Sequence, residues 1–292
     1  MKTTSLRLAR IIVALGAVLG LSACSAIKLG YNNFPEVAYW WMDGYIDFDD
    51  EQAPRARAEL ARLHGWHRQQ ELPRYIEILG RMERIVPGAV APQQACSLVA
   101  EVRGRLKLVA DQAEPAVAAL AASLTPDQLR HLERKHHSNN DKFRKDWIHA
   151  PLPQQKDKRH EQALDRLESI YGRLDAAQRQ VLQRSIEQST FDPQRVLAER
   201  LRRQQDLLQT LRRLMEPGLA PAAARELVRG YVERVQRSPD ARYRAWQDDL
   251  QQENCRTFAA VHESTTAAQR EQAVRRLRAY QRDLRELAEQ QP

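Results

Sequence analysis

The chain has little glycine and few cysteines: its 292 residues include 11 glycines and three cysteines. No segment alternates apolar and polar residues for the length of a strand, which argues against β-structure. Apolar residues instead recur with the 3.6-residue period of a helix along most of the chain. We therefore expect an all-α fold, either a multi-helix bundle or an open helical cradle built of long amphipathic helices.

The chain also lacks the common catalytic motifs. It contains no G-x-S-x-G elbow, P-loop, G-x-G-x-x-G or H-E-x-x-H segment. His64 and His67 supply only half of a zinc site. The acidic segment that begins at Asp47 has no glycine at its sixth position and carries Ala58 at the twelfth, where a calcium loop has glutamate. We therefore predict no catalytic residue, no metal site and no cofactor.

Charge of one sign does not dominate. The chain has 46 Lys and Arg residues against 38 Asp and Glu, a net charge of +8, and both signs are interleaved along its length. Such mixing is typical of solvated helix faces and does not indicate a nucleic-acid groove. We expect no nucleic-acid partner.

The N-terminal residues predict the cellular compartment of the protein. Basic residues precede a short apolar run from Ile11 to Leu21, which is half the length needed to span a membrane and instead indicates a secretory signal. The run ends in Leu21-Ser22-Ala23-Cys24, which resembles the lipobox of bacterial lipoproteins. This resemblance implies lipidation of Cys24 after removal of residues 1–23. Because Ser25 and not Asp follows, it further implies attachment to the outer membrane, facing the periplasm.

We divide the chain into a signal peptide (1–23), a lipidated tether (24–30) and a single helical domain (31–292). Capping residues, prolines and apolar stripes predict its helices. For example, Asp192-Pro193 marks a helix start and Pro217-Gly218 follows a helix end. The expected ranges are 50–85 with a bend at Pro73, 92–122, 126–149, 155–172, 176–190, 193–215, 221–237, 239–262 and 267–289.

Two cysteines remain after Cys24, namely Cys96 and Cys255. An even pair in an oxidising compartment predicts a disulfide, and two buried free thiols are the alternative. The bond would close a loop of about 160 residues, which the chain-entropy model values at about 5 kcal/mol.

Three helix starts share a short pattern. Leu124-Thr125-Pro126-Asp127-Gln128 resembles the L-T-x-x-Q motif of the Spy and CpxP family of periplasmic helical chaperones, and partial copies start at Leu174 and Thr265. The resemblance implies a cradle that binds unfolded clients. The alternative is a capping box, in which Thr125 and Gln128 only start a helix.

Aromatic residues are concentrated between Tyr31 and Phe48. The Y-N-N segment, the Trp40-Trp41 pair and the acidic residues that follow resemble the start of an uncharacterised family of proteobacterial lipoproteins. The aromatics could pack in the core, lie at the membrane interface or form a ligand groove. The candidate binding surface comprises Tyr31, Trp40, Trp41, Tyr45, Leu124, Thr125 and Gln128.

Three functions are compatible with these features. The first is a non-enzymatic lipoprotein that binds periplasmic or outer-membrane proteins, as a chaperone-like or scaffold factor in envelope homeostasis. The second is a module whose Arg-rich faces bind lipopolysaccharide or peptidoglycan. The third is a cell-wall hydrolase. The partners expected are the membrane, through the lipid anchor, and other envelope proteins.

Overall fold

The structure, a computed structural model, describes residues 27–290. The predicted signal peptide and Cys24 lie outside these residues. Within them the regular secondary structure is entirely helical, which confirms the all-α prediction. None of the described helices is long and apolar enough to cross a membrane.

The helices follow the predicted ranges closely. They are α2 (Phe34–Ile46), α3 (Gln52–Gln70), α4 (Leu72–Ile85), α5 (Pro92–Ala122), α6 (Pro126–Phe143), the π-helix η1 (Arg144–Ile148), α7 (Leu152–Tyr171), α8 (Ala176–Glu187), α9 (Pro193–Leu214), α10 (Pro221–Gln236), α11 (Ala241–Ser264) and α12 (Ala267–Glu289). The predicted helix 50–85 is divided at Glu71, just before Pro73. The last residues of the predicted helix 126–149 form η1.

The aromatic segment is also helical, although no helix was predicted before residue 50. Residues 27–32, which include part of the expected tether, are helical, and α2 follows with Pro35 in its first turn. Its apolar residues occupy opposite faces, because Tyr39 is buried while Trp40 and Trp41 are exposed. No single apolar stripe therefore marks this helix in the sequence.

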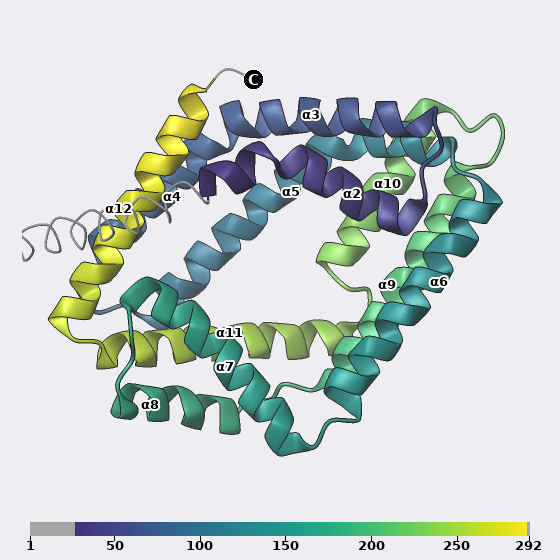
Figure 1. The fold of residues 1–292 in the computed structure, drawn as a ribbon. Helices are drawn as coiled ribbons and strands as arrows, with labels where there is room; N and C mark the ends of the chain where they lie inside the picture. Colours follow the sequence, from purple (N-terminus) through teal and green to yellow (C-terminus); the bar gives the residue numbers. More distant parts are fainter. Residues whose placement is uncertain (1–26, 291–292) are drawn as a thin grey trace, which may run out of the picture.

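The helices follow the sides of a four-sided frame (Figure 1). One side contains α2 and α3, the next α6 and α9, the third α8 and α11, and the fourth α4 and α12. The 31-residue helix α5 runs diagonally across the frame and contacts α3, α10 and α11.

Two apolar cores hold the frame together. The first core joins α5, α6, α9 and α10, and includes Leu124, Leu132 and Leu211. The second core joins α7, α8, α11 and α12, and includes Tyr171, Leu182 and Leu277. The apolar sides of most helices therefore pack into one of these two separate cores.

Candidate functional site

The motif residues Thr125 and Gln128 form a capping box at the start of α6. The backbone N–H of Thr125 donates to Gln128 Oε1 at 2.9 Å, and the N–H of Gln128 donates to Thr125 Oγ1 at 3.3 Å. Leu124, directly before them, is buried in the first core. This part of the candidate surface therefore starts a helix and packs the interior.

Gln128 also pairs with Gln52, and the two side chains are buried together. Gln128 Nε2 donates to Gln52 Oε1 at 2.5 Å and to the carbonyl of Asp47 at 2.8 Å. Gln52 Nε2 donates to Gln128 Oε1 at 3.3 Å and to the carbonyl of Ser123 at 2.7 Å. We call this the first glutamine pair.

The same arrangement recurs between Gln178 and Gln269, the second glutamine pair. Gln178 Nε2 donates to Gln269 Oε1 at 2.7 Å and to the carbonyl of Ser264 at 2.9 Å. Gln269 Nε2 donates to Gln178 Oε1 at 3.0 Å and to the carbonyl of Arg173 at 3.0 Å. In both pairs each amide reaches the carbonyl two residues before the other helix's capping residue.

The two pairs mark a structural repeat. Around the first pair, α2 contacts α3 and α6, and α3 contacts α5; around the second, α7 contacts α8 and α12, and α8 contacts α11. The sequence pattern found three of the four capping boxes. The fourth joins Asp49 to Gln52 and was missed because Phe48-Asp49 replaces Leu-Thr there.

Tyr31 lies apart from the other candidate residues. Its hydroxyl is 2.9 Å from Nδ1 of His67, its ring centre is 4.5 Å from that of His64, and the Arg68 guanidinium lies 5.3 Å from its ring centre. Burial raises the pKa of Tyr31 to about 12 and lowers the pKa of His67. This cluster packs the N-terminal helical segment against α3.

Trp41 and Tyr45 line a cavity between α2, α6 and α9. The cavity measures about 350 Å³ and is mostly apolar; its lining includes Trp41, Tyr45, Leu132, His136, Arg200 and Leu207. The Tyr45 hydroxyl accepts a hydrogen bond from Asn139 at 2.8 Å. Burial, and then the nearby Arg200 charge, lowers the pKa of His136. A small apolar group fits this space, with a polar edge at His136 and Arg200.

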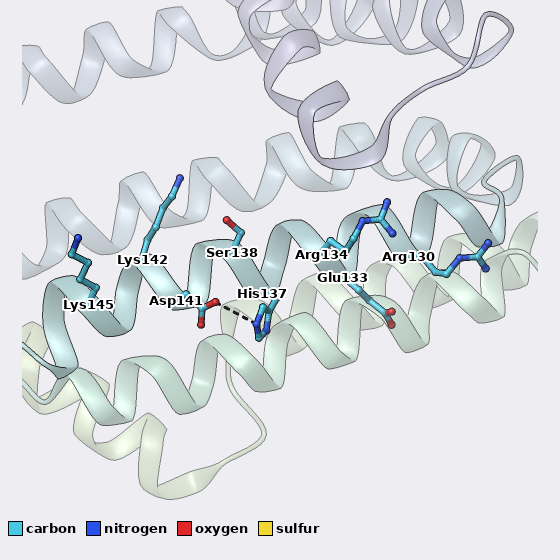
Figure 2. A pocket seen from close by; sticks show the side chains of 8 residues that line it. All are labelled: Arg130, Glu133, Arg134, His137, Ser138, Asp141, Lys142 and Lys145. Atoms are coloured by element: carbon cyan, nitrogen blue, oxygen red, sulfur yellow. Dashed lines mark ion pairs between the residues drawn. The ribbon is translucent and has the colours of Figure 1, made fainter.

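The outer face of α6 and η1 is a shallow basic surface. Figure 2 shows its eight side chains projecting from this one helical stretch: Arg130, Glu133, Arg134, His137, Ser138, Asp141, Lys142 and Lys145. Asp141 lies 3.3 Å from His137, and Glu133 accepts from Arg212 at 2.7 Å. Because both acids have basic neighbours, the other bases leave the surface with a net positive charge.

Helix α5 carries exposed apolar side chains that the sequence analysis did not single out. Val99, Leu106 and Val117 are 38%, 57% and 44% exposed. Spacings of seven and eleven residues place all three on one face of a helix. We call this face the α5 stripe. Leu108 is also exposed, at 42%, but lies on the opposite side of the helix. The stripe has no distinctive signal in the sequence, because apolar residues that are buried, such as Ala95 and Ala121, occupy positions beside it.

The structure joins Cys96 of α5 to Cys255 of α11 in a disulfide, as the sequence predicts, with Cα atoms 5.6 Å apart. The helices it connects hold equivalent places in the repeat, before the second capping box of each half. Within residues 27–290, no group of three or more His, Cys, Asp or Glu side chains is arranged to hold a metal ion.

A family model described as "Family of unknown function (DUF6279)" matches residues 44–232. This range begins within α2 and ends within α10, so it includes the first glutamine pair, the α5 stripe and the cavity lining from Tyr45 onward, but not Trp41. No curated protein and no solved structure matches the chain.

Proposed function

Because the chain belongs to the DUF6279 family, whose function is unknown, we propose from its own features that it is a non-enzymatic protein that binds other polypeptides. The proposal includes anchoring by lipid on Cys24 at the periplasmic face of the outer membrane. The uncharacterised family predicted from the aromatic segment agrees with the match; its lipoprotein character belongs to the proposal.

The α5 stripe is the observation that carries the proposal. A soluble helix normally covers such a row with a neighbouring element, because each large apolar side chain gains about 1.5–3 kcal/mol when fully buried. From Val99 to Val117 the stripe extends about 27 Å along the helix axis. An extended chain of about eight residues has the same length.

The surroundings of the stripe favour weak and unspecific binding. Arg103 and Lys107 lie next to it on α5, and Arg103 already donates to Gln251 at 2.6 Å. Ordering a flexible segment costs much of the free energy that three apolar contacts supply. A client would therefore bind reversibly, as a holding chaperone or a scaffold requires.

The test is a light-scattering assay of a chemically denatured client diluted into the mature lipoprotein. We expect the parent to delay aggregation at stoichiometric amounts and Leu106→Glu to lose most of this effect. Leu152→Glu is the matched control, because Leu152 is 61% exposed but lies outside α5, on α7. Equal activity of the two variants, or no activity of the parent, would contradict the proposal.

The anchor requires a separate test. Mass spectrometry of the N-terminal peptide should show Cys24 as the first residue with acyl chains attached, and fractionation should place the protein in the outer membrane. Cys24→Ala should carry no acyl chains. A mature chain without acyl chains would contradict the anchor but not polypeptide binding.

The basic surface of α6 favours a second candidate, an anionic envelope polymer such as lipopolysaccharide. Binding through these side chains should weaken steeply as salt rises, because exposed charges are screened within about 10 Å at 0.1 M salt. Arg134→Glu together with Lys142→Glu should abolish a salt-sensitive pull-down of lipopolysaccharide. Capture that is independent of salt and of these substitutions would count against this candidate.

A further inference from the structure

The helical segment from residue 27 to residue 46 has an exposed face with an unusual composition. It exposes five large apolar side chains, namely Leu29 (67%), Phe34 (54%), Val37 (61%), Trp40 (59%) and Trp41 (64%). We propose that this face, which we call the aromatic face, lies in the interfacial layer of a lipid membrane. The inference goes beyond polypeptide binding and assigns the face to a different partner.

The helical segment contributes no charged residue to the aromatic face, and the nearby Arg57 guanidinium of α3, 5.3 Å from the Trp40 ring centre, is paired with Glu36. At 100° per residue, Phe34, Val37, Trp40 and Trp41 fall within an arc of about 120°. Gly44 falls in the same arc, and a Cβ added there would meet no other atom within 4 Å, so the arc is open. The acidic residues of α2, Glu36 and Asp43, lie outside it. An exposed face without charge is atypical in a chain of which 29% is charged.

The opposite side of the segment is fixed to the body, so the face keeps one orientation. Tyr39 is buried, with the guanidinium carbon of Arg57 3.6 Å from its ring centre. Arg68, itself buried, donates to Asn32 Oδ1 at 2.8 Å and to the carbonyl of Leu287 at 3.0 Å. A face held in this way projects as a rigid surface.

Two features favour lipid over a protein as the occupant. Tryptophan is enriched at membrane interfaces, where its apolar ring and polar N–H are both accommodated. Leu29 is also only five residues after Cys24, a distance of at most about 17 Å along the chain. If Cys24 is lipidated as proposed, the face lies within reach of the bilayer; its composition and exposure do not depend on the anchor.

The experiment uses tryptophan fluorescence, because two of the chain's five tryptophans lie on the face. The mature protein is reconstituted into phosphatidylcholine vesicles whose acyl chains are brominated, which quenches only tryptophans at the membrane. We expect clear quenching in the parent and a several-fold smaller quenched fraction in Trp40→Phe/Trp41→Phe. This variant keeps the aromatic face apolar but removes the two tryptophans whose fluorescence reports on it.

Trp147→Phe is the matched control and should keep the parent's quenched fraction. Equal quenching in the parent and the double variant, or none in either, would overturn the proposal. A chain that begins at Ser25, with neither acyl chains nor the apolar signal, separates this proposal from the anchor: added vesicles should still quench Trp40 and Trp41 in it. Self-association of this chain that Trp40→Glu abolishes, without quenching by vesicles, would assign the face to a second copy and overturn a lipid partner.

Discussion

The hydroxyl of Tyr171 lies 2.8 Å from Nδ1 of His262, and both side chains are fully buried in the second core. Nε2 of His262 lies 2.8 Å from the carbonyl of Gly88, which can only accept a hydrogen bond. Nε2 therefore carries the proton, and Nδ1 accepts from Tyr171. Burial lowers the pKa of His262 and raises the pKa of Tyr171 to about 12, so both are neutral at pH 7.

This pair predicts a loss of stability in mild acid. The pKa of His262 is lower in the folded state than the value of about 6.5 expected in the unfolded state, so below pH 6.5 the unfolded chain binds the extra proton first. The free energy of unfolding should fall by up to about 1.4 kcal/mol per pH unit from this group. His262→Gln should show a flatter curve in urea unfolding between pH 7 and 5. Exposed His137→Gln should follow the parent, and parallel curves for parent and His262→Gln would contradict the assignment.

The ionised Glu199 side chain predicts a second loss of stability, at lower pH than the loss caused by His262. Burial acts to raise its pKa, but hydrogen bonds from Arg202, Arg203 and Ser238 outweigh burial and lower the pKa to about 2. Its contribution to stability is complete above about pH 4.5 and is lost as the pH falls toward 2. Glu199→Gln should cost about 3 kcal/mol at pH 7 and much less at pH 3. Exposed Glu161→Gln is the control; a cost that does not change with pH would rule out this charge as its cause.

The glutamine pairs predict that replacing one of their side-chain amides by an apolar group lowers the stability of the fold considerably. Gln128→Leu leaves the Asp47 carbonyl and the Thr125 N–H without their partner, at about 1–3 kcal/mol for each unsatisfied buried group, while the Gln52 amide keeps its bond to the Ser123 carbonyl. Gln52→Leu/Gln128→Leu should cost less than the sum of the single substitutions, because each single substitution already breaks the bonds between the two amides. Urea unfolding measures the stability of the single and the double variants. Exposed Gln93→Leu is the control, and a Gln128→Leu chain of normal stability that no longer delays aggregation would instead favour a client contact.

The disulfide predicts that the protein is less stable under reducing conditions. Cys96 and Cys255 are 159 residues apart, for which the chain-entropy model gives about 5 kcal/mol. Cys96→Ser/Cys255→Ser should unfold at markedly lower denaturant concentration, and a reductant should shift the parent toward it. The double variant itself should not respond to the reductant. An unchanged midpoint in the variant would show that contacts between α5 and α11 suffice without the bond.

Local signals in the sequence were sufficient to predict most of the helices. Thr125, Asp192 and Thr266 cap helices where predicted, because a capping bond depends only on residues within one turn. The segment α2 was missed because its apolar residues face both inward and outward. The pairing of Gln52 with Gln128 could not be predicted, because it depends on how distant helix starts meet. The candidate residues are separated for the same reason: Tyr31 packs against His67, Tyr45 lines the cavity and Thr125 caps α6, and each of the first two contacts depends on helices that are distant in the sequence.

The diagonal course of α5 has a mechanical consequence. A four-sided frame whose corners act as hinges deforms by shear, whereas a diagonal member divides it into triangles and resists that deformation. Helix α5 is such a member, tied near its start by the bond from Cys96 to Cys255 and at its end by the Gln52 amide on the Ser123 carbonyl. A force applied to the side that contains α2 and α3 is therefore transmitted across the molecule as tension or compression along α5. The distance between the two apolar cores then stays the same.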